Sequence, residues 1–349
     1  MTAVSPLDEY YLTNYTKCVP MPYFDSQDFF ETVMNYLTAP SIVFGIYGII
    51  MIVVASRDNM KSAKWVLLNH QVSSFWCGSL ACYLVRPYIH FPTPARYYSG
   101  LLLLVDWFPF KLLNFLGLVS QPIEAISRAM IFENRYSKIN MNKKYVMGRK
   151  LRFLFFSAHY ILFLAIYMYH VFYSIVDDVS AKMEILKKVP CPDKTFFHKN
   201  CRVMAYTVTQ DLWIIAFQSH YLFGLSFFLA ILCGFCLWTT TSHLSQATRK
   251  MQQRFFIALT LQTLIPFSVM YIPTVLYWAV SAMGIPFNST GRLTIICIVL
   301  HSILGSILLV VLHRPHWEYT MKLLCCRQTN VGTNVFVTST APLKRTSRI

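Results

Sequence analysis

The stretch Thr32–Ala55, TVMNYLTAPSIVFGIYGIIMIVVA, runs for 24 residues without an Asp, Glu, Lys or Arg. A helix needs about 20 mostly apolar residues to cross a bilayer, so this stretch is long enough for one crossing. Further stretches without these four residue types are Trp65–Val85, Phe153–Val176, Leu212–Thr248, Phe255–Gly291 and Leu293–His313. One such stretch alone could be a buried helix of a soluble protein, but their repetition excludes that interpretation.

A seventh apolar region differs from the others because it contains charges. Residues 97–131 carry Asp106, Lys111, Glu124 and Arg128 in an otherwise hydrophobic sequence. Over the 349 residues of the chain, 55% are hydrophobic and 13% are charged, whereas a soluble domain has about 25% charged residues. The chain therefore lacks the charges that would cover a large soluble fold.

These patterns predict an all-α polytopic membrane protein, with a bundle of seven transmembrane helices over residues 31–313. The expected spans are residues 32–55, 65–87, 97–131, 153–176, 210–240, 255–281 and 293–313. Residues 1–30 form an N-terminal segment ahead of the bundle. After it, Trp317 and its neighbours predict a juxtamembrane amphipathic helix over 314–326. Residues 327–349 are rich in Ser and Thr and are predicted to be a disordered tail.

The distribution of charge predicts which way the bundle faces. The chain has 31 Lys and Arg against 15 Asp and Glu, a net charge of +16. The side of the membrane reached by spans one, three, five and seven holds 20 of the basic residues and three acids, and the other side holds ten of each. Basic residues favour the cytoplasm, so the N-terminus is expected outside and the C-terminus inside. Topology explains the basic excess, and no nucleic-acid partner is expected.

Candidate modification sites agree with this orientation. Two glycosylation sequons begin at Asn14 and Asn288, both on the predicted extracellular side. Three cysteines on the same side are candidates for one disulfide, and the sequence does not choose the pair: Cys18, Cys191 and Cys201. Cys325 and Cys326 follow span seven on the cytoplasmic side, where they are either palmitoylated or unmodified thiols.

Span three is expected to be the central, polar-lined helix. Its residues Asn114, Gln121, Glu124 and Arg128 are separated by 7, 3 and 4 positions, which places them on one helical face. Glu124 precedes Arg128 by four residues, the favourable order for a helical ion pair, although Arg128 could instead extend to the cytoplasmic interface. Five histidines are scattered over the spans and are interpreted as polar packing residues: His70, His159, His170, His220 and His301.

The cytoplasmic end of span three carries a candidate switch. It reads Ile131-Phe132-Glu133-Asn134-Arg135-Tyr136, with an acid two positions before an arginine. An ion pair there could hold the helix end, and its opening would make Arg135 available to a partner. In span six, Pro266 and Pro273 predict bends that are either static or act as hinges.

Several segments of the chain are similar to a known receptor family. They are Phe132–Tyr136, Met251–Leu259, Gln262–Pro266 with Pro273, and His313–Pro315. With seven spans and an outside N-terminus the chain resembles a G-protein-coupled receptor, and these segments most resemble the nematode serpentine chemoreceptors, especially class H. The resemblance covers residues 30–325. It implies a plasma-membrane receptor of sensory cilia that detects small environmental chemicals and signals through a heterotrimeric G protein, with Glu133 and Arg135 as its switch.

The chain departs from rhodopsin-like receptors at two places. Tyr97–Trp107, at the outer end of span three, contains no Cys, and Ser302–Leu312 in span seven contains no Pro. The cysteine that usually bonds to the second extracellular loop is therefore missing. If a disulfide forms, its pair is Cys18 with Cys191 or Cys201, or Cys191 with Cys201.

We therefore expect a chemosensory receptor with no enzymatic activity, no cofactor and no metal site. The ligand is expected in the outer half of the bundle, with five candidate lining residues: Trp107, Lys111, Gln218, Tyr271 and Trp278. The candidate G-protein surface, part of which could bind anionic membrane lipid, comprises Glu133, Arg135, Lys138, Arg249, Lys250 and Arg254. The alternative is a seven-helix ligand-gated channel or transporter; the predicted orientation opposes an insect-type odorant channel, and no internal repeat supports a transporter.

Overall fold

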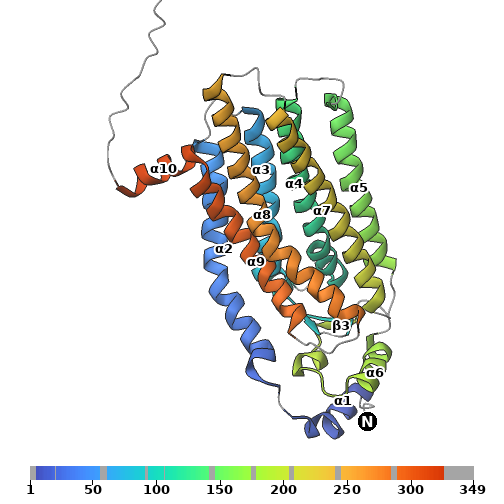
Figure 1. Ribbon diagram of the computed structural model, residues 1–349. Helices are drawn as coiled ribbons and strands as arrows, with labels where there is room; N and C mark the ends of the chain where they lie inside the picture. Colours follow the sequence, from blue (N-terminus) through green and yellow to red (C-terminus); the bar gives the residue numbers. More distant parts are fainter. Residues whose placement is uncertain are drawn as a thin grey trace, which may run out of the picture.

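The computed structural model describes most of the chain and shows an elongated helical bundle (Figure 1). The described residues are 5–19, 21–55, 61–90, 93–105, 107–140, 146–173, 178–203, 208–239, 245–283 and 289–325. Within them the bundle helices are α2 (Gln27–Ala55), α3 (Lys61–Ser79), α4 (Phe110–Ile139), α5 (Arg149–Tyr173), α7 (Val208–Thr239), α8 (Gln246–Ala282) and α9 (Thr290–Leu312). An all-α bundle of seven helices is thus confirmed, with a small sheet added to it.

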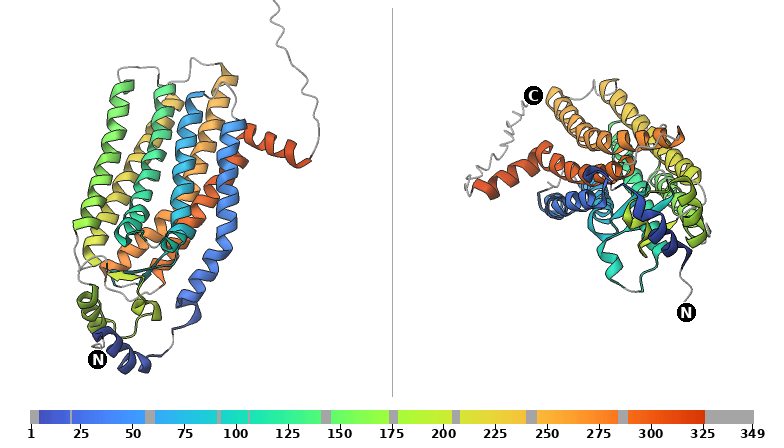
Figure 2. Two further views of the ribbon diagram at one scale, coloured as in Figure 1. Left: turned by 180° about the vertical axis from the view of Figure 1, so that it is seen from behind. Right: turned by 90° about the horizontal axis from the view of Figure 1, so that it is seen from below.

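The two ends of the bundle carry different structures. At one end lie α1 (Pro6–Thr13), α6 (Asp178–Lys188) and the sheet, and at the other α10 (Arg314–Cys325) projects sideways from the bundle (Figures 1 and 2). We call these the sheet end and the α10 end. The helix predicted over 314–326 corresponds to α10, whereas the tail from residue 327 lies outside the described residues.

Five of the described helices are long and apolar enough to cross a membrane, by length and composition: segments of α2, α5, α7, α8 and α9. The other two bundle helices, α3 and α4, are more polar, and several of their polar side chains lie inside the bundle. On α3 these include His70 and Gln71, and on α4 they include Glu124 and Arg128, all of them buried. Ionisable groups at membrane depth usually face the bundle interior, as they do here.

The polar helix α4 occupies the middle of the bundle. It packs against α3, α5 and α7, while α9 packs against α2, α3 and α8. The largest apolar core lies around α4 and includes Ile126, Phe132 and Tyr167. Close approach of α2 to α3 depends on Gly45, because a Cβ there would overlap the ring of Phe75.

Residues 97–109 differ from the predicted third span. Tyr97 and Tyr98 belong to a strand, and the helix begins only at Phe110, with Pro109 as its N-cap. The strands are β1 (Pro87–His90), β2 (Ala95–Tyr98) and β3 (Cys201–Val203), antiparallel in the order β1-β2-β3. Backbone groups at 95–98 are paired on both sides of the strand, and β3 comes from a segment about 100 residues away, which local patterns do not predict.

Short helices complete the described chain. The one-turn elements are η1 (Tyr15–Lys17), η2 (Tyr23–Asp25), η5 (Leu101–Leu104) and η7 (Lys194–Phe197), and a π-helical turn, η4 (Leu80–Leu84), extends α3. After η4 the chain turns sharply into β1 at Arg86, which has a positive φ of 45°. Gly100 is required near this turn, because a Cβ there would overlap the carbonyl of Leu84.

Candidate functional site

A buried ion pair on α4 lies in the core of the bundle. The Nη2 atom of Arg128 lies 2.6 and 2.5 Å from the two carboxylate oxygens of Glu124, and both side chains are almost completely buried. The guanidinium carbon of Arg128 also lies 4.9 Å from the centre of the Phe267 ring on α8. Arg128 therefore stays inside the bundle and does not extend to an interface. The predicted i, i+4 pair is formed.

Two histidines, His70 and His301, also contact this ion pair. We call the four residues Glu124, Arg128, His70 and His301 the central cluster. His70 on α3 approaches the Oε1 atom of Glu124 to 3.6 Å through Nδ1, and His301 on α9 approaches the same oxygen to 3.4 Å through Nε2. The sequence interpretation as packing residues missed this shared role, because the two histidines are 231 positions apart. The sequence offered one signal for this role: each histidine lies in an apolar stretch that contains no Asp, Glu, Lys or Arg.

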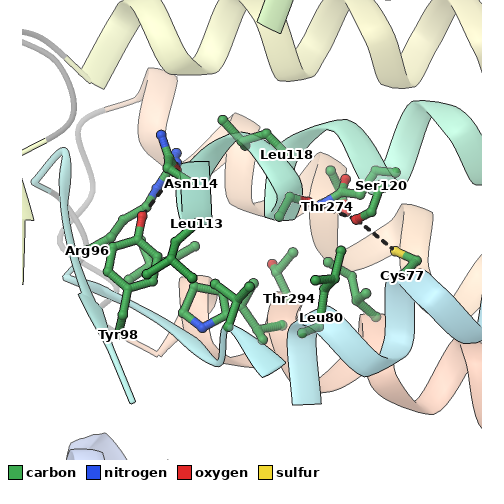
Figure 3. Close-up of a pocket in the computed structure, with 18 of the residues that line it drawn as sticks. Cys77, Leu80, Arg96, Tyr98, Leu113, Asn114, Leu118, Ser120, Thr274 and Thr294 are labelled. Carbon is green, nitrogen blue, oxygen red and sulfur yellow. Dashed lines mark hydrogen bonds between the residues drawn. The ribbon is translucent and has the colours of Figure 1, made fainter. Parts of the chain in front are cut away.

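A cavity of about 80 Å³ lies between the central cluster and the sheet end. We call it the first cavity. Its walls come from α3, η4, α4, α8, α9 and strands β1 and β2, and they are mostly apolar. Leu80 and Leu113 belong to these walls (Figure 3), and so does Ile298. Polar groups enter at a few places only, including Thr274, Thr294 and Arg96. An apolar chamber with few polar groups is typical of small-molecule sites.

Arg96 enters the first cavity from strand β2. Its Nη1 atom donates to the Oδ1 atom of Asn114 on α4, and the hydroxyl of Tyr98 donates to the same oxygen at 3.1 Å (Figure 3). The expected polar face of span three thus begins with Asn114 at this cavity. Sequence reasoning missed Arg96 and Tyr98 as lining residues, because they were assigned to a connection and to a helix.

A smaller cavity of about 20 Å³ lies between α4, α7 and α8. We call it the second cavity. Gln121 and Thr274 line both cavities, so the two are neighbours. Arg128 and Phe267 also line the second cavity, and so does Gln218, which is buried with 4% of its surface exposed.

The five predicted ligand residues have separate positions. Gln218 and Tyr271 both line the second cavity, where Tyr271 stacks on Phe267 with ring centres 4.9 Å apart. Trp107 is 78% exposed and lines neither cavity, and the amine of Lys111 donates to the carbonyl of Phe172 at 3.2 Å. Trp107 lies in the turn that precedes α4, whereas Lys111 lies on the first turn of α4 and its amine contacts α5, so neither side chain reaches the cavities.

The side chain of the fifth candidate, Trp278, lies outside the described residues, although its backbone belongs to α8. Both hinge candidates, Pro266 and Pro273, also fall within α8, which runs from Gln246 to Ala282. The carbonyl of Pro273 accepts a hydrogen bond from the hydroxyl of Thr294 on α9 at 3.4 Å. Pro273 is therefore hydrogen-bonded to α9 through Thr294, a residue that lines the first cavity.

At the α10 end, the acid and the arginine of the candidate switch have different partners. Glu133 forms an ion pair with Arg152 on α5, at 2.7 Å between Oε2 and Nε. The guanidinium carbon of Arg135 lies 3.5 Å from the centre of the Phe255 ring on α8. The expected pairing of Glu133 with Arg135 is therefore wrong for this structure, because neighbouring helices supply a partner to each side chain.

The remaining predicted residues of the G-protein surface lie around this α4–α8 contact. Lys138 is exposed on the last turn of α4, and Arg249, Lys250 and Arg254 follow one another along the first turns of α8. Arg249 is half-buried and the other three are exposed. Tertiary structure thus brings two separate basic segments to one end of the bundle.

The sheet end contains the disulfide. Cys18 is bonded to Cys191, which ties the N-terminal segment to the chain between α6 and η7. Cys201 is a buried free thiol in β3. Asn14 is exposed at the end of α1, whereas Asn288 lies outside the described residues. Of the palmitoylation candidates, Cys325 ends α10 and Cys326 lies outside the described residues.

A buried polar network holds the sheet end on the bundle. Asp193 caps η7 by accepting from the amide of Thr195 at 2.9 Å, and it also accepts from the amide of Gln27 on α2 at 3.3 Å. Arg292 on α9 pairs with Asp25 at 2.9 Å. Burial lowers the pKa of His90 in β1 to about 4, with Arg292 and Lys182 acting in the same direction and Asp193 in the opposite one.

Comparison with known proteins places this arrangement in one family. The family described as "Serpentine type 7TM GPCR chemoreceptor Srh" matches residues 25–326. Serpentine receptor class H-72 of Caenorhabditis elegans is 26% identical over 319 residues, covering 89% of this chain and 90% of that protein. Serpentine receptor class r-10 of Caenorhabditis briggsae is 29% identical over 117 residues, which cover 33% of this chain and 34% of that protein.

The fold has a solved counterpart. Squid rhodopsin superposes with a TM-score of 0.58 at 13% sequence identity, covering 90% of this chain and 86% of rhodopsin. At this identity the similarity shows the fold alone.

Proposed function

Because the chain belongs to the Srh family of serpentine seven-transmembrane G-protein-coupled chemoreceptors, a family of receptors and not of enzymes, we propose that it binds a small environmental chemical within its bundle and activates a heterotrimeric G protein. The protein is a multi-pass membrane protein. The proposal further locates it in the plasma membrane of a sensory cilium, with the sheet end outside and the α10 end in the cytoplasm.

The observation that carries the proposal is the first cavity in this receptor fold. It is a mostly apolar chamber formed by four bundle helices and closed towards the sheet end by strand β2. The helices that line it, α3, α4, α8 and α9, continue to the end that carries Arg135 and the basic residues of α8. A ligand between these helices can favour one arrangement of them over another, which is the physical requirement for signalling across the membrane.

The test uses the full chain in cells that carry a G-protein reporter and a panel of volatile and water-soluble chemicals. A concentration-dependent signal that Arg135→Ala abolishes at equal surface expression supports the proposal. Arg314→Ala removes an exposed arginine of α10 at the same end that is not part of the candidate G-protein surface; it is the matched control and is expected to keep the signal. A ligand-gated current that persists without G protein would instead support the channel alternative.

A further inference from the structure

The second cavity carries a hydrogen-bonding requirement that no described residue meets. The Oε1 atom of Gln218 is buried and accepts no hydrogen bond from any described residue. Leaving a buried acceptor unpaired costs about 1–3 kcal/mol. The side chain lies at a cavity of about 20 Å³, which is enough for one polar group of the size of water. The site therefore requires a donor.

The charges around the second cavity favour a donor without net charge. Arg128 lines the cavity, but its charge is already matched by Glu124 at 2.5 Å. A carboxylate on the ligand would have to lie near the Glu124 carboxylate, and an ammonium near the Arg128 guanidinium. Burial of an unmatched charge is costly in either case. A hydroxyl avoids both costs, since it donates to Gln218 and can accept from an N–H group of Gln121 or Arg128.

The first cavity provides room for the rest of such a molecule. Gln121 and Thr274 line both cavities, so a molecule that has its polar group beside Gln218 can extend past them. Beyond them the walls are largely aliphatic, with Leu80, Leu113 and Ile298. An apolar body is stabilised there by roughly 25 cal/mol for each Å² removed from water.

We propose, on the basis of the function proposed above, that the ligand is a neutral small molecule with an apolar body in the first cavity and a hydroxyl group bound to Gln218 in the second. This assigns Gln218 as the residue that selects alcohols. A carboxylate-bearing ligand held by Arg96, at the opposite side of the first cavity, is the competing outcome.

The test compares ligands that share a carbon skeleton. The purified full-length receptor in lipid nanodiscs is titrated with linear alcohols of three to eight carbons, with the methyl ethers and the carboxylates of the same chain length, and the thermal shift is recorded. We expect the alcohols to bind, and to bind more tightly than the methyl ethers or the carboxylates of the same chain length. In Gln218→Met, affinity for the alcohols falls roughly tenfold, as expected for one buried hydrogen bond, and affinity for the ethers stays unchanged.

Two controls make the result decisive. Gln253→Met removes an amide near the α10 end of α8 and should leave every affinity unchanged. Gln218→Asn covers the case in which Gln218→Met does not fold. It should also lose affinity for the alcohols and keep its affinity for the ethers. Three results would overturn the inference: equal loss for alcohols and ethers, tighter binding of the carboxylates, or no shift with any alcohol. Because this readout needs no G protein, alcohol binding without a reporter signal would support the ligand class and contradict the proposed signalling.

Discussion

At the scale of single residues, Glu124 has the largest predicted effect on stability. It is fully buried and is the only acid within contact distance of Arg128 among the described residues. Glu124→Gln leaves the guanidinium charge unmatched in the core. We therefore expect the free energy of unfolding to fall by about 3–5 kcal/mol, which thermal unfolding of the purified receptor would measure. The double variant with Arg128→Met should recover part of this loss.

The matched control for this prediction is Glu318. Its pair with Arg314 on α10 is also an i, i+4 pair, at 2.6 Å, but it is exposed. Exposed pairs contribute about 0–1 kcal/mol, so Glu318→Gln should change little. Equal stability of the Glu124 and Glu318 variants would show that the central cluster does not hold a charge pair.

Phe255 is the residue through which Arg135 contacts α8. The guanidinium carbon lies 3.5 Å from the ring centre, and such a contact is worth roughly 0.5–2 kcal/mol. If this contact holds α4 and α8 together in the inactive state, Phe255→Leu should raise the basal reporter signal severalfold, while Phe255→Tyr keeps a ring and should leave it near the starting level. A Tyr variant as active as the Leu variant would contradict the prediction.

At the scale of elements, the disulfide joins the N-terminal segment to the η7 connection at the sheet end. The bond between Cys18 and Cys191 spans 173 residues of sequence, and native disulfides contribute roughly 2–4 kcal/mol. Cys18→Ser is therefore expected to lower the unfolding temperature of the receptor by several degrees. Cys201→Ser changes a free thiol and should not alter the sensitivity of unfolding to reductant, whereas loss of that sensitivity in Cys201→Ser would reassign the pair.

The sheet should loosen as the pH falls. The pKa of His90 is lowered to about 4, compared with about 6.5 in an unfolded chain. Between these values the unfolded state binds more protons, so the sheet end loses stability as the pH falls from about 6.5 to about 4, by no more than roughly 3 kcal/mol.

Hydrogen exchange measures this effect in strands β1 and β2. After correction for intrinsic exchange rates, the strands of the wild-type protein should open more often as the pH is lowered from 7 to 5. His90→Gln keeps a polar side chain beside Thr195, whose hydroxyl lies 3.3 Å from the ring Nε2 atom, and should remove most of the pH dependence. An identical pH dependence in both proteins would assign the titration to another group.

Much of the element structure follows from sequence patterns. Apolar stretches of about 20 residues predict the bundle helices because a bilayer requires that length and their backbone bonds are local. The start of α4 could not be predicted in this way. Tyr97 and Tyr98 are apolar enough for a span, and they become a strand only because β1 and β3 pair with them.

At the scale of the whole molecule, the orientation proposed from charge is directly testable. Asn14 is exposed at the end of α1, on the sheet end. If this end faces outside, Asn14 should be glycosylated, and Asn14→Gln should remove a mass shift that a glycosidase also removes. An N-terminal epitope accessible only in permeabilised cells would contradict the proposed orientation and would favour the channel alternative.

The sequence alone determined the class of the protein and the family it resembles, and it favoured the Glu124–Arg128 pair without excluding the alternative position of Arg128. Each depends on composition or on short spacings along one helix. Tertiary structure alone decided that His70 and His301 meet at Glu124, that Arg135 contacts Phe255 and not Glu133, and that the Oε1 atom of Gln218 lies at a cavity with no donor among the described residues. The reason is physical: these contacts join helices far apart in sequence, and they depend on how the helices pack.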